Sequence, residues 1–222
     1  MRFQDKCTLW QPQREIVIKL KHLFTLRNRL ITSKKRLLTP LKESVPFIAK
    51  KHQKELQNTC NPALKGVEKS IKEVERKITQ LIKSDSKLAH MTDIITSIDG
   101  VGTQTATALI VATNEFTQVK TARGLACYAG IAPFEHSSGT SVRGRAHVSN
   151  LANKKLKAIM HMGALSAIQN SAEFRSYYER KVKEGKPKMV VINSVKNKQI
   201  LRICACLRDN RLYEKNYTRK VA

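Results

Sequence analysis

The stretch "LKGVEKSIKEVERKITQL", from Leu64 to Leu81, carries the clearest structural signal in the first part of the chain. Its apolar residues recur at alternating intervals of three and four, at Leu64, Val67, Ile71, Val74, Ile78 and Leu81. This heptad spacing gathers the apolar side chains into one stripe of an α-helix and leaves the other faces to charged residues. Such a helix needs a partner helix to cover its stripe.

A second, less regular apolar stripe precedes it, at Ile16, Leu20, Leu23, Leu30, Leu37 and Leu41. Three prolines predict breaks or bends in this region, at Pro40, Pro46 and Pro62. An antiparallel hairpin within one chain and a coiled coil between two chains both satisfy the pattern, because a stripe does not reveal which chain supplies its cover. We therefore expect residues 1–87 to form a helical coiled-coil stalk, with a homo-oligomer as one outcome.

Charge dominates the composition. The 222 residues include 42 Lys and Arg against 17 Asp and Glu, a formal net charge of +25. This excess repels itself in a compact fold unless a polyanion offsets it, and nucleic acid is the polyanion that basic proteins most often meet. A basic ribosome-associated protein explains the charge equally well. A membrane-surface protein is disfavoured, because no segment joins a basic face to a Trp-rich or Phe-rich one.

The five cysteines and the apolar runs exclude several other classes. The cysteines are odd in number and form no CxxC pair, which argues against a disulfide framework and a zinc ribbon. The first ten residues lack the apolar core of a signal peptide, and no apolar run reaches about 18 residues. We expect a cytoplasmic, nucleoid-associated protein that does not engage membranes.

From Leu88 onward the sequence predicts a compact all-α domain, residues 88–222, around one irregular segment. The stretch "ITSIDGVGTQTATALIVAT" places Gly100 and Gly102 between two helices, with Thr103 at the start of the second. Glycines permit a tight turn, and the N–H groups at a helix start can bind an anion. This helix-hairpin-helix-like turn predicts contact with a DNA phosphate, whereas an ordinary turn between helices is the alternative.

The irregular segment, "PFEHSSGTSVRGRAHVSN", runs from Pro133 to Asn150 and is expected to form a loop that includes a small hairpin. Ser137 and Ser138 precede a glycine, so they form either a polar turn or a presented nucleophile. Arg143, Arg145 and His147 fall on alternate residues. In an extended segment they would share one side, where they would suit a phosphodiester. Further basic residues begin the next predicted helix, at Lys154 and Lys155.

The carboxylates do not predict a metal site. A two-metal nuclease needs several acidic residues that converge on divalent ions. The acidic residues of this region are scattered, at Asp93, Asp99, Glu115 and Glu135. We therefore expect no metal ligands and no self-sufficient metal nuclease in this chain.

The turn, the serine loop and the helices after it, residues 91–209, together resemble the C-terminal domain of the insertion sequence 110/116/902 family of transposases. The resemblance implies that a serine directly before glycine, here Ser138, attacks DNA and forms a transient phosphoserine link, with Ser137 as the second choice. It implies that Arg143 and Arg145 bind the strand being cut, and that the Gly100 turn binds backbone. It further implies a guide RNA encoded by the element.

In that family, a RuvC-like domain with a DEDD carboxylate set supplies Mg²⁺, usually from another subunit. Met1 lies just before the coiled-coil segment, so the resemblance predicts a truncated transposase that binds DNA and does not cleave it unaided. Asn150 and Ala152 also depart from the basic residue and glycine usual in the family. The competing hypothesis is a non-catalytic nucleic-acid-binding regulator, which assembles with intact transposase subunits through the 64–81 stripe. Enzymatic activity of the chain alone stays open at this point.

Overall fold

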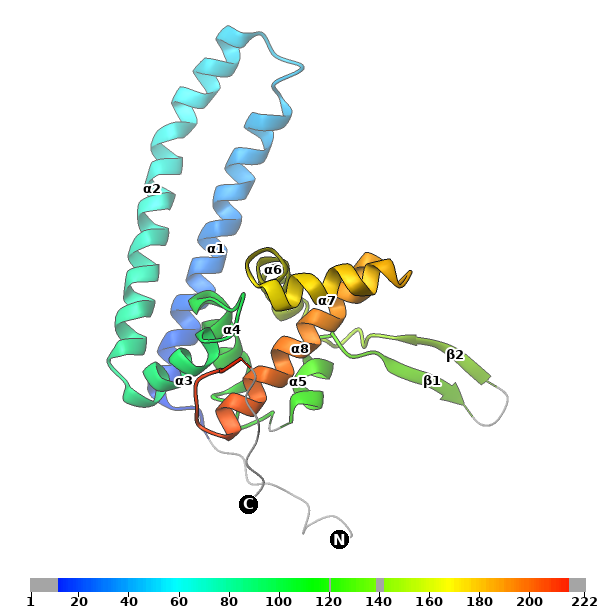
Figure 1. Ribbon diagram of the computed structural model, residues 1–222. Helices are drawn as coiled ribbons and strands as arrows, with labels where there is room; N and C mark the ends of the chain where they lie inside the picture. The colour runs from blue at the N-terminus through cyan, green and yellow to red at the C-terminus, as the bar shows by residue number, and fades with distance from the viewer. Residues whose placement is uncertain (1–11, 120, 139–141, 216–222) are drawn as a thin grey trace, which may run out of the picture. The chain divides into compact units, whose positions relative to one another are not determined.

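The computed structural model describes residues 12–119, 121–138 and 142–215 (Figure 1). The chain divides into two compact units, Met1–Ser84 and Asp85–Ala222. Within the described ranges it forms eight α-helices and one two-stranded antiparallel sheet. The prediction of a mainly α protein is confirmed.

The first unit consists of two long helices that contact each other, α1 (Glu15–Glu43) and α2 (Lys50–Lys83). Residues of the predicted heptad stripe are buried at Leu64, Val74 and Ile78, and the others in it are half-buried. Two ion pairs join the helices along one side of the stripe, between Arg27 and Glu75 at 2.7 Å and between Lys34 and Glu68 at 2.7 Å. The heptad pattern thus correctly predicts which face of α2 is buried or half-buried.

The predicted breaks are wrong at two of the three prolines. Pro40 lies inside α1 and Pro62 lies inside α2, whereas Pro46 falls in the connection between the helices. A proline removes one N–H donor and crowds the preceding turn, which costs about 3 kcal/mol in a helix interior. Pro40 stands near the end of α1, where few turns follow. Past Pro62 the apolar stripe from Leu64 onward continues to favour the helix.

The second unit holds six helices and the sheet. Their bounds are α3 (Ser86–Thr96), α4 (Thr103–Thr113), α5 (Ala122–Tyr128), β1 (Phe134–Ser138), β2 (Val142–His147), α6 (Lys154–Asn170), α7 (Ala172–Lys183) and α8 (Lys188–Arg208). Helix α8 contacts α3, α5, α6 and α7, and its Val195, Ile200 and Ile203 are fully buried. Helix α8 therefore belongs to the core of this unit.

Polar side chains mark where three of these helices begin. Asp85, Thr121 and Asn153 each precede a helix and accept a hydrogen bond from the backbone N–H three residues later. Such caps satisfy donors that the first turn of a helix leaves unpaired. Because the caps fix the helix starts, they also fix the short connections that carry the candidate site.

The serine segment contains the small hairpin that the sequence predicts. Residues 134–138 and 142–147 pair as an antiparallel β-hairpin, which extends away from the helices of this unit (Figure 1). Alternating polar and β-branched residues, as in the stretch from Ser141 to Arg143, are typical of strands. The second unit is therefore helical except for one regular hairpin.

Candidate nucleic-acid interface

The turn between α3 and α4 depends on glycine at position 100. Gly100 has a φ of +79°, in the region that L side chains rarely adopt. A Cβ there would stand 2.4 Å from the carbonyl oxygen of Gly163 and 2.6 Å from the Cβ of Ala167. The turn thus lies directly on the backbone of α6, and only glycine allows this approach.

A buried glutamine holds the two segments together. The Nε2 of Gln199, on α8, donates to the carbonyl oxygen of Asp99 at 3.0 Å and to that of Gly163 at 3.3 Å. Gln199 is fully buried. Sequence reasoning missed this residue, although a signal exists: Gln199 interrupts the apolar stripe of α8 between Val195 and Ile203. A polar residue in such a stripe indicates a buried hydrogen bond.

The start of α4 is open to a ligand. Gly102 is its N-cap and makes no side-chain cap bond, and Thr103 is exposed. No atom lies within 4 Å of a Cβ placed on Gly102, so the fold itself does not demand glycine there. The turn borders a hollow of about 390 Å³, lined by Thr96, Ser97, Ile98, Asp99, Gly100, Val101, Gly102 and Ser166. Uncapped N–H groups beside an open hollow suit an anion such as a phosphate.

Lys154 and Lys155 are exposed in the first turn of α6, the helix that carries Gly163. Nine residues separate Lys154 from Gly163, or roughly 14 Å at 1.5 Å per residue. The lysines therefore lie at the start of α6, whereas the Gly100 turn packs against the middle of the same helix. This arrangement allows contacts to two separate phosphates.

The two candidate serines hold different positions in the hairpin. Ser137 pairs with Arg143 across the strands, whereas Ser138 pairs with Val142. The two serines therefore occupy successive register positions of β1, each opposite a different residue of β2.

The two strands do not pair in one continuous register. The register shifts between Phe134 and His136, so that Phe134 pairs with His147 while His136 pairs with Gly144. Two residues of β2 therefore oppose one of β1, as in a β-bulge at positions 145–146. That Arg143, Arg145 and His147 share one side stays a prediction.

The described residues do not fit a metal ion. Among them, no group of three or more His, Cys, Asp or Glu side chains is arranged to hold one. Glu115, one of the acidic candidates, is buried and pairs with Lys87 at 3.3 Å. Its carboxylate thus has a structural partner within the unit. No helix in the described ranges is long and apolar enough to cross a membrane.

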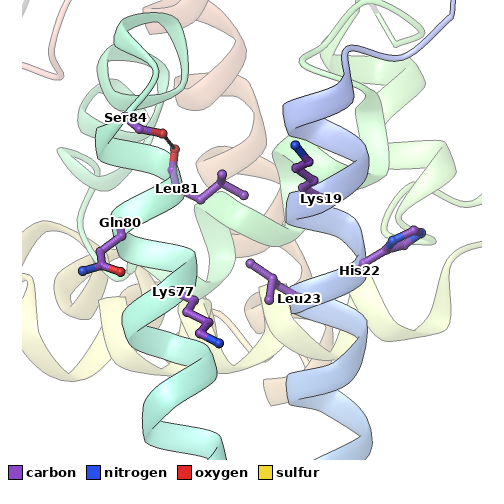
Figure 2. A pocket seen from close by; sticks show the side chains of 7 residues that line it. All are labelled: Lys19, His22, Leu23, Lys77, Gln80, Leu81 and Ser84. Atoms are coloured by element: carbon purple, nitrogen blue, oxygen red, sulfur yellow. Dashed lines mark hydrogen bonds between the residues drawn. The ribbon is translucent and has the colours of Figure 1, made fainter.

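A larger cavity, of about 550 Å³, lies between α1 and α2 of the first unit (Figure 2). Figure 2 shows Leu23 and Leu81 on facing sides of the gap, with Lys19 and Lys77 near its ends. The remaining lining residues are His22, Gln80 and Ser84. None of the residues predicted to bind DNA lines this cavity, so we do not place the site there.

A family model matches part of the second unit. Residues 92–179, which include the turn and the hairpin, match the family model described as transposase IS116/IS110/IS902 family. The chain is 32% identical over 153 residues to the insertion element IS110 uncharacterized 43.6 kDa protein of Streptomyces coelicolor, covering 69% of this chain and 38% of that protein.

Two further relatives come from other bacteria. The pilin gene-inverting protein of Moraxella bovis is 27% identical over 212 residues, or 93% of this chain and 62% of that protein. A probable family 20 transposase of Pseudomonas aeruginosa is 24% identical, over 72% of this chain and 46% of that protein. The chain thus spans between 38% and 62% of the length of these three relatives. Together the matches support the IS116/IS110/IS902 transposase family for this chain.

Proposed function

We propose that this chain is the DNA-binding and serine-bearing part of a transposase-type recombinase. The observation that carries the proposal is the family match over residues 92–179, which spans both the Gly100 turn and the serine hairpin. The name of one relative, a pilin gene-inverting protein, describes a rearrangement of DNA. A net charge of +25 suits a protein that binds the phosphate backbone.

Three elements would contact DNA in this proposal. The open start of α4 at Gly102 and Thr103 would hold one phosphate through backbone N–H groups. The exposed lysines at the start of α6 would meet a second phosphate. The arginines of β2 would bind the strand that reacts.

The serine would act as a nucleophile on a phosphodiester. Its oxygen forms a bond to phosphorus, the bond from phosphorus to one deoxyribose oxygen breaks, and the proton of the hydroxyl leaves to a base or to water. The departing deoxyribose oxygen takes up a proton, and the phosphate stays on the serine. Ser138, which directly precedes a glycine, is our first candidate, and Ser137 is the second.

The acidic residues needed for metal ions would come from outside the described residues, because those residues offer no such cluster. We propose that a RuvC-like domain of another subunit supplies Mg²⁺ and completes the site. An element-encoded guide RNA is a further expected ligand. The regulator hypothesis keeps DNA binding and subunit assembly but gives the serine no part in the reaction.

Titration of the purified chain against a labelled DNA duplex tests the proposal. Fluorescence anisotropy at several NaCl concentrations should show binding whose affinity falls steeply with salt, because bound lysines and arginines release counterions from DNA. A protein of the same charge that lacks this fold, such as the urea-unfolded chain after dilution into native buffer without refolding, serves as a control for charge alone. If the folded chain shows no binding at low salt, the proposed function is wrong.

A further inference from the structure

Lys196, on α8, is a largely buried lysine, with only 4% of the residue exposed. Among the described residues, none forms a hydrogen bond or ion pair with its ammonium group. Burial, together with the nearby charge of Lys157, lowers the pKa of Lys196. A partly desolvated ammonium group without a counter-ion costs free energy, so a bound anion would stabilise it.

The place of Lys196 in the fold indicates where an anion would meet its ammonium group. One turn earlier on α8, the Nδ2 of Asn193 donates to the carbonyl oxygen of Ile131 at 2.7 Å. Ile131 lies three residues before β1, where the chain leaves α5 for the hairpin. Because residues three apart on a helix share a side, Lys196 stands on the side of α8 that faces this entry to the hairpin.

Lys157, on α6, reaches the same region. A Cβ placed on Gly130 would stand 3.6 Å from the Cδ of Lys157 and 3.2 Å from a methyl carbon of Val148. Gly130 precedes the hairpin, and Val148 directly follows β2. We call the region of these two residues the hairpin root. The aliphatic part of the Lys157 side chain therefore lies beside the hairpin root. The two lysines therefore flank one point of the molecule.

The charges around this point are of one sign. Among the described residues, Lys157 is the ionisable group whose charge acts on Lys196, and neither lysine forms an ion pair with a carboxylate there. Lys157 is the fourth residue of α6, where the positive end of the helix dipole adds to the field. Two ammonium groups, one on the first turns of α6 and one on the neighbouring α8, form a site for a phosphate-like anion.

We propose that Lys157 and Lys196 bind one phosphate of the DNA backbone at the root of the serine hairpin. The inference rests on the proposed function and adds a ligand position to it. A phosphate bound there would position the DNA backbone at the point where the hairpin begins. The DNA and the β-strand that carries the serines would then be held at the same place in the protein. The phosphate also acts as the counter-ion of the Lys196 ammonium group, which has none among the described residues.

Two variants and one control test this site. Lys196→Met and Lys157→Met keep an unbranched apolar stem and remove the charge. Lys198→Met is the matched control, because it removes the same charge from the same helix, where the Lys198 ammonium lies 4.6 Å from the centre of the Tyr177 ring. Each variant is compared with the full chain in two measurements, one with inorganic phosphate and one with DNA.

The first measurement is thermal unfolding in sodium phosphate against sodium chloride of equal ionic strength. Phosphate should raise the Tm of the wild-type chain and of Lys198→Met, and this gain should disappear in Lys196→Met. In chloride, Lys196→Met should unfold at a higher temperature than wild type, since it buries no unpaired charge. An equal phosphate gain in wild type and Lys196→Met overturns the inference.

The second measurement is the anisotropy titration with a DNA duplex. Lys196→Met and Lys157→Met should each weaken binding about five- to tenfold more than Lys198→Met does, and should lower the salt slope by about 1, the change expected for one lost phosphate contact. If wild type binds DNA while all three variants bind equally well, the lysine site is wrong and the proposed function stands. If wild type binds no DNA, the proposed function fails, whatever the phosphate measurement shows.

Discussion

The side-chain amide of Gln199 donates to the backbone carbonyl oxygen of Asp99 at 3.0 Å, across a separation of 100 residues in the chain. The same nitrogen donates to Gly163, so one buried side chain joins the turn before α4, the middle of α6 and the core helix α8. The turn proposed to hold a DNA phosphate is therefore positioned by a residue of the core that has no exposed surface. Its geometry depends on the core as much as on its own glycines.

Replacing Gln199 by Met should destabilise the second unit by about 1–3 kcal/mol, because two buried carbonyl oxygens lose their donor while the side-chain volume is kept. Urea unfolding measures this change. Gln169→Met is the control, because Gln169 is exposed on the same unit and its replacement should change stability by less than about 0.5 kcal/mol. Equal effects from the two substitutions would show that the Gln199 bonds contribute nothing measurable.

Gly100→Ala should cost more than either of two other glycine substitutions. Gly100 and Gly185 both have positive φ, +79° and +85°, but only Gly100 has backbone atoms within 3 Å of the new Cβ. We expect about 1–2 kcal/mol for the left-handed backbone in Gly185→Ala, and a further 1–3 kcal/mol, roughly, for the clash in Gly100→Ala. Gly102→Ala should leave stability nearly unchanged, because its surroundings are open.

DNA affinity separates these variants further. Gly102→Ala should weaken DNA binding although the protein stays stable, because the added methyl group stands where a phosphate would approach the start of α4. Anisotropy titration of Gly102→Ala and Gly185→Ala, at temperatures where both are folded, makes the comparison. Unchanged affinity in Gly102→Ala would remove this turn from the DNA interface.

Cys204 should react slowly with thiol reagents in the folded chain. Burial raises its pKa to about 11, so at pH 8 only about one molecule in a thousand carries the reactive thiolate. Alkylation by iodoacetamide, followed by mass spectrometry, should show the rate at Cys204 rising about tenfold per pH unit between pH 8 and 10. In urea the rate at pH 8 should be far higher, and a folded rate equal to that in urea would contradict the burial of this thiol.

Sequence reasoning predicts the helices of this protein well because their signals are local. The 3–4 spacing from Leu64 to Leu81 and the caps at Asp85, Thr121 and Asn153 each act within one or two turns of chain. The tight turn at Gly100 belongs to this class too, because the glycines near it are a local signal for a turn.

Features that depend on distant partners could not be predicted in this way. The function of Gln199 requires knowledge of which carbonyl oxygens meet α8, and the charge of Lys196 is unusual only because the fold buries it. The bulge in β2 depends on how two strands align, which the alternation of Arg143 and Arg145 does not reveal. The turn after α4 is a further case, because Asn114, Glu115 and Phe116 all have positive φ without a glycine among them.

The last prediction concerns which serine reacts. In a reaction mixture that contains a partner transposase lacking its own serine, Ser138→Ala should lower DNA strand transfer by roughly a thousandfold or more, as loss of a nucleophile does in other enzymes. Ser137→Ala should retain most of the activity. Denaturing gels measure the covalent protein–DNA adduct, and the same DNA affinity in both variants serves as the control for folding.

The hairpin register supplies a reason why Ser137 could be the nucleophile instead of Ser138. Ser137 is the cross-strand partner of Arg143, an arginine proposed to bind the reacting strand, whereas Ser138 pairs with Val142. If Ser137→Ala abolishes the adduct and Ser138→Ala does not, the pairing with Arg143 selects the nucleophile, and the position directly before glycine does not. Full activity in both variants would instead favour the regulator hypothesis, because DNA binding and subunit assembly need neither hydroxyl.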